Sequence, residues 1–346
     1  MNTRRRWLER GLRSTDVQEV LALVIMLVLI MLLMSQASNL FLTPRNLTNL
    51  LMDTTTVGII AVFSTMLMIS RGLDLSVAAA AAFCGILIGR MQETNGLWAG
   101  AVVAIGAGGL IGLINGFLVT YVGINPLITT LGMLSMLRGL AFVLSDGLTI
   151  PVFDLTGQRM DEYLAFAQLA EGRAAGIPYP ILIMLGLFLI GLIVLRSTSY
   201  GRALYAIGGN EEASVLAGLS VKRYRMTAYI LSGISAALAG ILLTARLYAA
   251  DPRAAPNIEL TVITAVVLGG TSLSGGQGNL FGTLLGVLII GALLNGLKLQ
   301  SVSTEMQNIA QGLVLMLAVA IDQVRQGRVM FGLGTLRRWV QRKSTG

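Results

Sequence analysis

Residues 97–122 read LWAGAVVAIGAGGLIGLINGFLVTYV, a stretch without a single charged side chain. An α-helix of this length extends for about 39 Å, which exceeds the roughly 30 Å thickness of a bilayer's hydrocarbon core. Gly108, Gly112 and Gly116 are spaced four apart and therefore share one helical face, where small residues let helix backbones approach closely. The stretch predicts a membrane-spanning helix that packs tightly against a neighbour.

The rest of the chain repeats this character. Of its 346 residues, 55% are hydrophobic and only 12% are charged, about half the charged fraction of a soluble domain. We predict membrane spans at residues 17–37, 50–69, 75–88, 97–122, 126–144, 178–195, 226–248, 260–270, 280–297 and 306–322. The third and eighth are short, which is tolerated where non-helical backbone is buried in protein or lines a cavity. The sequence thus predicts an all-α, polytopic membrane helix bundle of about ten transmembrane helices, forming one domain over residues 1–346.

The first apolar run follows a cluster of basic residues and therefore resembles a signal peptide. The run over residues 17–34 is nearly a full span, however, and no small-residue cleavage site follows it directly. We expect a first helix that is retained, with residues 1–16 as a basic cytoplasmic tail.

The distribution of basic residues predicts the orientation. An even number of spans places both ends on one side, and 17 of the 25 Lys and Arg residues then fall on that side. They lie in the tail 1–16, at one turn, in the loop 196–225 and in the basic tail 323–346. By the positive-inside rule both termini are cytoplasmic. Orientation in a lipid bilayer also accounts for the net charge of +8, so we expect no nucleic-acid partner.

The segment 145–177 falls on the periplasmic side in this topology. It is acidic, with Asp146, Asp154, Asp161, Glu162 and Glu171. Two interpretations stay open: an acidic rim that faces a partner, or a solvated connecting loop.

Two matching pieces suggest an internal repeat. Leu-Ile-Asn-Gly at 113–116 and Leu-Leu-Asn-Gly at 293–296 end the fourth and ninth predicted spans. Those two helices run in opposite directions, as they would in an inverted repeat of spans two to five and seven to ten, an arrangement common in transporters.

The chain lacks the residues that several kinds of catalytic and binding site require. The chain has no histidine and a single cysteine, Cys84, which excludes His-dependent catalysis and an internal disulfide. No paired carboxylates and no GxxxxGK[ST] phosphate-binding loop are present. We expect no catalytic site, no metal site and no cofactor; if ATP drives this protein, another chain binds it. Most charges lie at the ends of spans, which counts against proton coupling. An ion-coupled secondary carrier, driven for example by sodium, stays open as the alternative from another class.

The cytoplasmic loop carries the signals of a short helix. Asn210 is a good N-cap, Glu211 and Glu212 suit the positive end of a helix dipole, and Gly218 can end the helix in the left-handed conformation. We predict a helix over residues 211–217, which includes Ala213 and Ala217.

Polar side chains within or beside the spans are candidates for a solute pathway, although such residues also join helices to one another. The candidates are Asp74, Asn115, Asn125, Thr129, Thr130 and Asn295. Asp74 is the strongest, because a carboxylate beside a broken helix is costly unless it is paired or hydrated.

Six stretches together resemble a known family. They are RGLDLS at 71–76, GLINGF at 112–117, NPLITTLGMLSMLRG at 125–139, GRALYAIGGNEEASVLAGLS at 201–220, SGISAALAG at 232–240 and VLGGTSLSGGQGNLFG at 267–282. They are similar to the permease subunits of the bacterial ABC importers for ribose, arabinose, xylose, galactose and autoinducer-2. The resemblance covers roughly residues 45–322 and depends on the combination of stretches.

The resemblance implies partners and roles. It implies an inner-membrane permease that forms a homodimer or pairs with a similar permease, a cytoplasmic ATPase with two nucleotide-binding domains, and a periplasmic sugar-binding protein. The helix at 211–217 resembles the coupling helix that docks into such an ATPase; a capped surface helix without a partner is the simpler alternative. A branched-chain amino-acid or nucleoside permease is the alternative within this class.

The chain departs from the family pattern at one turn. The family often has Gly-Gly before its Leu-Asp-Leu-Ser motif, but Arg71 stands in place of the first glycine. Val77 is followed by five alanines, so we expect a more helical backbone there than is usual in the family.

Overall fold

The computed structural model describes residues 14–92, 94–153 and 159–325. Nearly all of the two basic tails, and Asp154 of the acidic segment, lie outside these residues. The described chain is mainly helical, and its four strands are only two residues long each. Its helices are α2 (Ser14–Ala37), α3 (Pro44–Ile69), α4 (Val77–Met91), α5 (Leu97–Phe117), α6 (Pro126–Leu144), α7 (Met160–Glu171), α8 (Tyr179–Ser197), α9 (Ser199–Gly209), α10 (Glu211–Leu216), α11 (Val221–Leu247), α12 (Ile258–Leu268), α13 (Leu280–Leu299) and α14 (Thr304–Arg325).

The prediction of a polytopic helix bundle is confirmed. Within the described residues, eight helices are long and apolar enough to cross a membrane, namely α2, α3, α5 with its π-helical continuation η1 (Leu118–Val122), α6, α8, α11, α13 and α14. The two shorter apolar helices, α4 and α12, coincide with the third and eighth predicted spans. The total of about ten crossings stays a prediction.

Local capping explains where one helix differs from its predicted limits. α3 begins at Pro44, six residues before the predicted start at residue 50. The side-chain oxygen of Thr43 accepts a hydrogen bond from the backbone N–H of Asn46 at 3.4 Å. Proline at the first helical position suits the helix as well, because its fixed φ is already helical and its missing N–H would have no partner there. Capping therefore starts the helix in the polar stretch after Pro44, before the apolar run on which the prediction was based.

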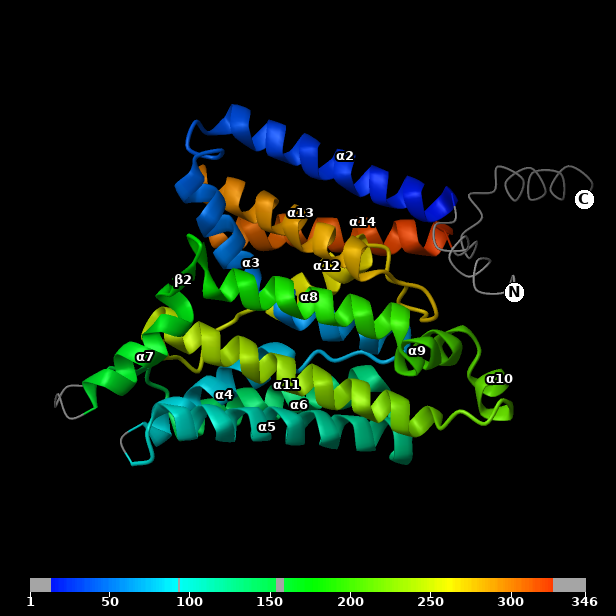
Figure 1. The fold of residues 1–346 in the computed structure, drawn as a ribbon, viewed down its shortest axis with the longest axis horizontal. Helices are drawn as coiled ribbons and strands as arrows, with labels where there is room; N and C mark the ends of the chain where they lie inside the picture. The colour runs from blue at the N-terminus through cyan, green and yellow to red at the C-terminus, as the bar shows by residue number, and fades with distance from the viewer. Residues whose placement is uncertain (1–13, 93, 154–158, 326–346) are drawn as a thin grey trace, which may run out of the picture.

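The helices run roughly parallel to a common axis, and the connections gather at its two ends (Figure 1). α10 lies at the same end as the first turn of α2 and the last turn of α14, whereas α7 lies at the opposite end. The predicted topology also places the loop 196–225 and the segment 145–177 on opposite sides; the side of the membrane that each end faces stays a prediction.

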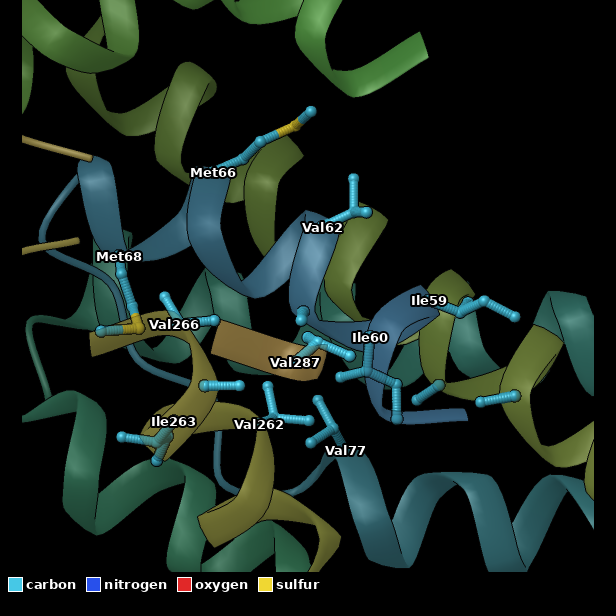
Figure 2. Close-up of a cluster of buried hydrophobic side chains, with 14 of the residues drawn as sticks. Ile59, Ile60, Val62, Met66, Met68, Val77, Val262, Ile263, Val266 and Val287 are labelled. Carbon is cyan, nitrogen blue, oxygen red and sulfur yellow. The ribbon is translucent and has the colours of Figure 1, made fainter. Parts of the chain in front are cut away.

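α3 forms the centre of the bundle and is the most buried of the eight long helices. Ile59, Ile60 and Val62 of α3 lie in one cluster with Val262 of α12 and Val287 of α13 (Figure 2). α2, in contrast, has no fully buried residue in its apolar length and packs mainly on α13. An apolar exposed helix at the edge of the bundle is what a lipid surrounding requires.

Glycines bring α5 and α11 into backbone contact. A Cβ atom built on Gly108 would lie 2.4 Å from the carbonyl oxygen of Gly233, and one on Gly112 would lie 2.2 Å from that of Tyr229. Similar approaches join α13 to α12, where a Cβ on Gly286 would lie 2.1 Å from the carbonyl oxygen of Ala265. The tight packing predicted from the glycine spacing is confirmed.

The packing partners follow the pattern of an inverted repeat. α4 packs against α5 and α6, and α12 packs against α13 and α14. The third helix of each half packs on the first helix of the other, because α5 packs on α11 and α13 packs on α3. These corresponding contacts agree with a repeat of α3–α6 and α11–α14.

Short strand pairs and ion pairs join the segments at the end of the bundle that carries α7. β1 (Ile150–Pro151) pairs antiparallel with β4 (Ala249–Ala250), and β2 (Arg173–Ala174) pairs with β3 (Ile177–Pro178). Asp53 of α3 contacts Arg246 of α11 at 2.6 Å and Lys298 of α13 at 3.1 Å. Tyr248 donates a hydrogen bond to Glu171. These contacts tie both halves together at the end opposite α10.

Candidate coupling and pathway site

The predicted short helix in the cytoplasmic loop is present as α10. The Asn210 side-chain oxygen accepts a hydrogen bond from the backbone N–H of Ala213 at 3.0 Å, and Glu211 and Glu212 occupy the first turn. The helix ends at Leu216, Ala217 is its C-cap, and Gly218 follows with a φ of 81° in the left-handed region. The local signals therefore identified both the beginning and the end of this helix.

α10 presents apolar side chains at the end of the bundle. Leu216 is 89% exposed and Val215 is 57% exposed. They border an open depression lined by Arg71, Gly209, Asn210, Glu211, Glu212, Val215 and Leu216. Exposed apolar side chains bordering a depression with a polar rim are characteristic of a protein interface.

The turn between α3 and α4 breaks the helix next to α10. Arg71 in this turn has a φ of 65°, a conformation that costs a residue other than glycine roughly 1–2 kcal/mol. Its guanidinium donates hydrogen bonds to the carbonyl oxygens of Gly208 at 2.8 Å and Gly209 at 3.2 Å. Both carbonyls lie at the negative end of the α9 dipole, so a cation is stabilised there. These bonds offset the backbone strain and explain how arginine can stand where the family often has glycine.

Asp74 in the same turn is the centre of a buried hydrogen-bond network. Its Oδ1 accepts bonds from the N–H of Ser76 at 3.0 Å and from the Ser76 hydroxyl at 2.6 Å. Its Oδ2 accepts a bond from the Ser232 hydroxyl of α11 at 2.9 Å, and Asn115 of α5 donates to the Ser76 Oγ at 3.0 Å. The Asp74 side chain is therefore buried with both of its oxygens hydrogen-bonded, as a buried polar group must be. α4 then begins at Val77 and includes the five alanines, as expected.

The other predicted pathway residues do not join this network. Asn125 is the exposed N-cap of α6, and Thr130 donates to the carbonyl of Pro126 at 2.8 Å. Thr129 is buried with an Oγ1 that has no hydrogen-bond partner in the described part of the chain. Asn295 exchanges amide hydrogen bonds with Asn46 at 2.8 and 3.2 Å, which joins α13 to α3. Of the six candidates, only Asp74 and Asn115 belong to the hydrogen-bond network around the turn, as far as the described residues show.

Sequence reasoning missed several members of the site. In the sequence, Ser232 stands out only as part of a family stretch, and Arg225 only as one of the cytoplasmic charges. Arg225 donates from Nε to the carbonyl oxygen of Ser70 at 3.0 Å and from Nη2 to Glu211 at 2.7 Å. Tyr229 contacts both backbone groups of Leu73, at 3.3 and 3.2 Å. The available signal was spacing, because Arg225, Tyr229 and Ser232 share one face of α11.

Comparisons with known proteins agree over most of the chain. Residues 46–319 match the family described as "Branched-chain amino acid transport system / permease component". The L-arabinose ABC transporter permease protein AraH of Azospirillum brasilense is 39% identical over 289 residues, 83% of each chain. The ribose import permease protein RbsC of Bacillus subtilis is 41% identical over 82% of this chain and 86% of its own length. The protein of the same name in Escherichia coli is 40% identical over 88% of this chain and 94% of its own length.

Proposed function

Because this chain belongs to the family of branched-chain amino acid transport system permease components, we propose that it is the membrane-spanning permease subunit of an ABC importer for a monosaccharide or a similar small polar solute. The observation that carries the proposal is the near end-to-end similarity to ribose and arabinose permeases. The family description names amino acids, but these relatives favour a sugar over a branched-chain amino acid or a nucleoside. The family match sets aside the ion-coupled carrier.

The proposed division of labour leaves ATP hydrolysis to a separate subunit. A cytoplasmic ATPase with two nucleotide-binding domains docks on α10, and the exposed Val215 and Leu216 suit such a contact. A periplasmic sugar-binding protein delivers the solute at the end that carries α7. A second permease copy, or a similar permease, completes the pair.

The pathway assignments are part of this proposal. Asp74 and Asn115 act by holding the turn 70–76 in place, because the carboxylate is already occupied by three hydrogen bonds. Thr129 is the better candidate for a solute contact, since its hydroxyl is free of other partners among the described residues. Asn125, Thr130 and Asn295 bond to their own or a neighbouring helix.

The orientation yields the first testable prediction. We propose that the protein lies in the bacterial inner membrane with both termini in the cytoplasm, as the excess of Lys and Arg on that side requires. Reporter fusions after residues 210 and 340 should both report cytoplasm, and a fusion near residue 160 should report periplasm. A cytoplasmic signal at residue 160 would contradict the orientation and the number of spans before it.

Reconstitution tests the transport function itself. The permease, its ATPase and its binding protein are placed in proteoliposomes with ATP inside and labelled ribose, arabinose, leucine or adenosine outside. We expect a sugar to enter only when binding protein and ATP are both present. Import of leucine or adenosine without any sugar would support the alternative substrates. Uptake that persists without the ATPase and stops when ion gradients are dissipated would reject an ABC importer.

A further inference from the structure

Arg225 lies at a junction between α10 and the turn that carries Asp74. Its Nη2 contacts Glu211 of α10 at 2.7 Å, and its Nε donates to the Ser70 carbonyl oxygen at 3.0 Å. The Arg225 side chain is 13% exposed and that of Glu211 is 43% exposed. One guanidinium thus joins a surface helix to a buried turn, in the fork geometry that suits arginine and not lysine.

The contact with Ser70 is the first of three along α11. Arg225, Tyr229 and Ser232 are spaced by four and then three residues, so they share one helical face. In the same order they contact Ser70, Leu73 and Asp74 of the turn. α11 therefore contacts the turn at three points in the order of the turn's own sequence, from Ser70 to Asp74.

A second arginine ties the same turn to the helix before α10. Arg71 donates to the carbonyls of Gly208 and Gly209 at the end of α9. Gly276 adds a backbone bond to the Ile69 carbonyl at 2.8 Å. Arg71 therefore holds the turn to the end of α9, and Arg225 holds it to the start of α10. Asn210 lies between these two helices.

The two glutamates at the start of α10 have different surroundings. Glu211 pairs with Arg225, whereas Glu212 makes no ion pair within the part of the chain that the structure describes. Both lie in the first turn and interact alike with the helix dipole. Glu212 is therefore a matched control for everything that Glu211 does except its contact with Arg225.

We propose that Arg225 is a positioning residue that passes the movement of α10 to the Asp74 turn through its paired contacts with Glu211 and Ser70. The proposal rests on the proposed importer function, in which α10 meets the ATPase. It assigns Glu211 to transmission within the permease and leaves docking to the exposed apolar residues of α10. If the contact between Arg225 and Glu211 is lost, the ATPase should stay bound, but less solute should be imported per ATP hydrolysed.

The test compares Glu211→Gln, Glu212→Gln and Arg225→Gln in the reconstituted complex with ATPase and loaded binding protein. The readout is the amount of solute imported per ATP hydrolysed, together with retention of the ATPase on purification. We expect Glu211→Gln and Arg225→Gln each to lower this ratio about fivefold, the effect of losing one modest interaction, with the ATPase retained. Glu212→Gln changes the same docking surface but leaves the Arg225 contact in place, so it should lower the ratio less than Glu211→Gln does.

Two further variants separate transmission from a general structural role. The double variant with both Glu211→Gln and Arg225→Gln should fall no further than either single variant, because residues that act through one contact are not additive. Arg225→Lys keeps the charge beside Glu211 and should recover part of the ratio.

A parental ratio for Glu211→Gln, an equal loss for Glu212→Gln, or additive losses in the double variant would each overturn the proposal. If Arg225→Gln failed to accumulate in the membrane, the comparison of the two glutamate variants would decide alone, since both side chains lie at the surface. A parent complex that imported no solute at all would instead reject the proposed function.

Discussion

Replacing Gly112 with valine should prevent the bundle from assembling. A Cβ atom at Gly112 would lie 2.2 Å from the carbonyl oxygen of Tyr229 and 2.7 Å from the Cα of Ile230. These are backbone atoms of a long helix and cannot turn aside as a flexible side chain does. α5 and α11 would have to separate, at a cost above the roughly 1–3 kcal/mol typical of an overpacked core. Tyr229 would move with them and release its bonds to Leu73.

The measurement is the amount of folded protein in the membrane and its melting temperature after extraction in detergent. Gly106→Val is the matched control, because Gly106 belongs to the same helix and a Cβ there meets no atom within 4 Å. We expect near-parental yield for Gly106→Val and little or no folded protein for Gly112→Val. Equal yields would show that close contact between α5 and α11 is not required for folding.

Replacing Gly218 with valine should separate the ATPase from an otherwise folded permease. Gly218 has a φ of 81°, and a Cβ there would meet no atom within 4 Å. Steric crowding is therefore absent, and the penalty of roughly 1–2 kcal/mol comes from the left-handed backbone alone. Relief of that strain would disturb the last turn of α10, where Gly218 donates to the Val215 carbonyl at 2.9 Å. Leu216, the most exposed apolar residue of α10, would be displaced from its docking position.

The readout is recovery of the ATPase with the purified permease, followed by uptake in proteoliposomes. Gly218→Asn serves as the control, because asparagine tolerates the left-handed conformation better than other non-glycine residues. We expect the asparagine variant to retain the ATPase and the valine variant to lose it together with uptake. If the valine variant assembled and transported like the parent, α10 would be an ordinary surface helix. The docking contact would then be sought in the turn at 272–279.

Features that depend on neighbouring residues were predictable from the sequence. The limits of α6, Pro126–Leu144, agree with the prediction because Asn125 caps the helix and proline opens it. α10 was predictable for the same reason, since its cap and its terminal glycine lie within nine residues of each other. The close approach of α5 to a neighbour followed from glycine spacing, but the identity of that neighbour did not.

The membrane bundle is predictable from the sequence, because hydrophobicity, span length and helix caps are each encoded within one continuous stretch of chain. Which polar groups meet depends instead on tertiary packing. Ser232 lies 158 residues after Asp74, and Arg225 lies 155 residues after Ser70. Such contacts depend on how whole helices are placed, and no local pattern encodes that placement. Arg225 was accordingly one cytoplasmic charge among several in the sequence, and the packing of α11 along the turn made it the link between α10 and Asp74.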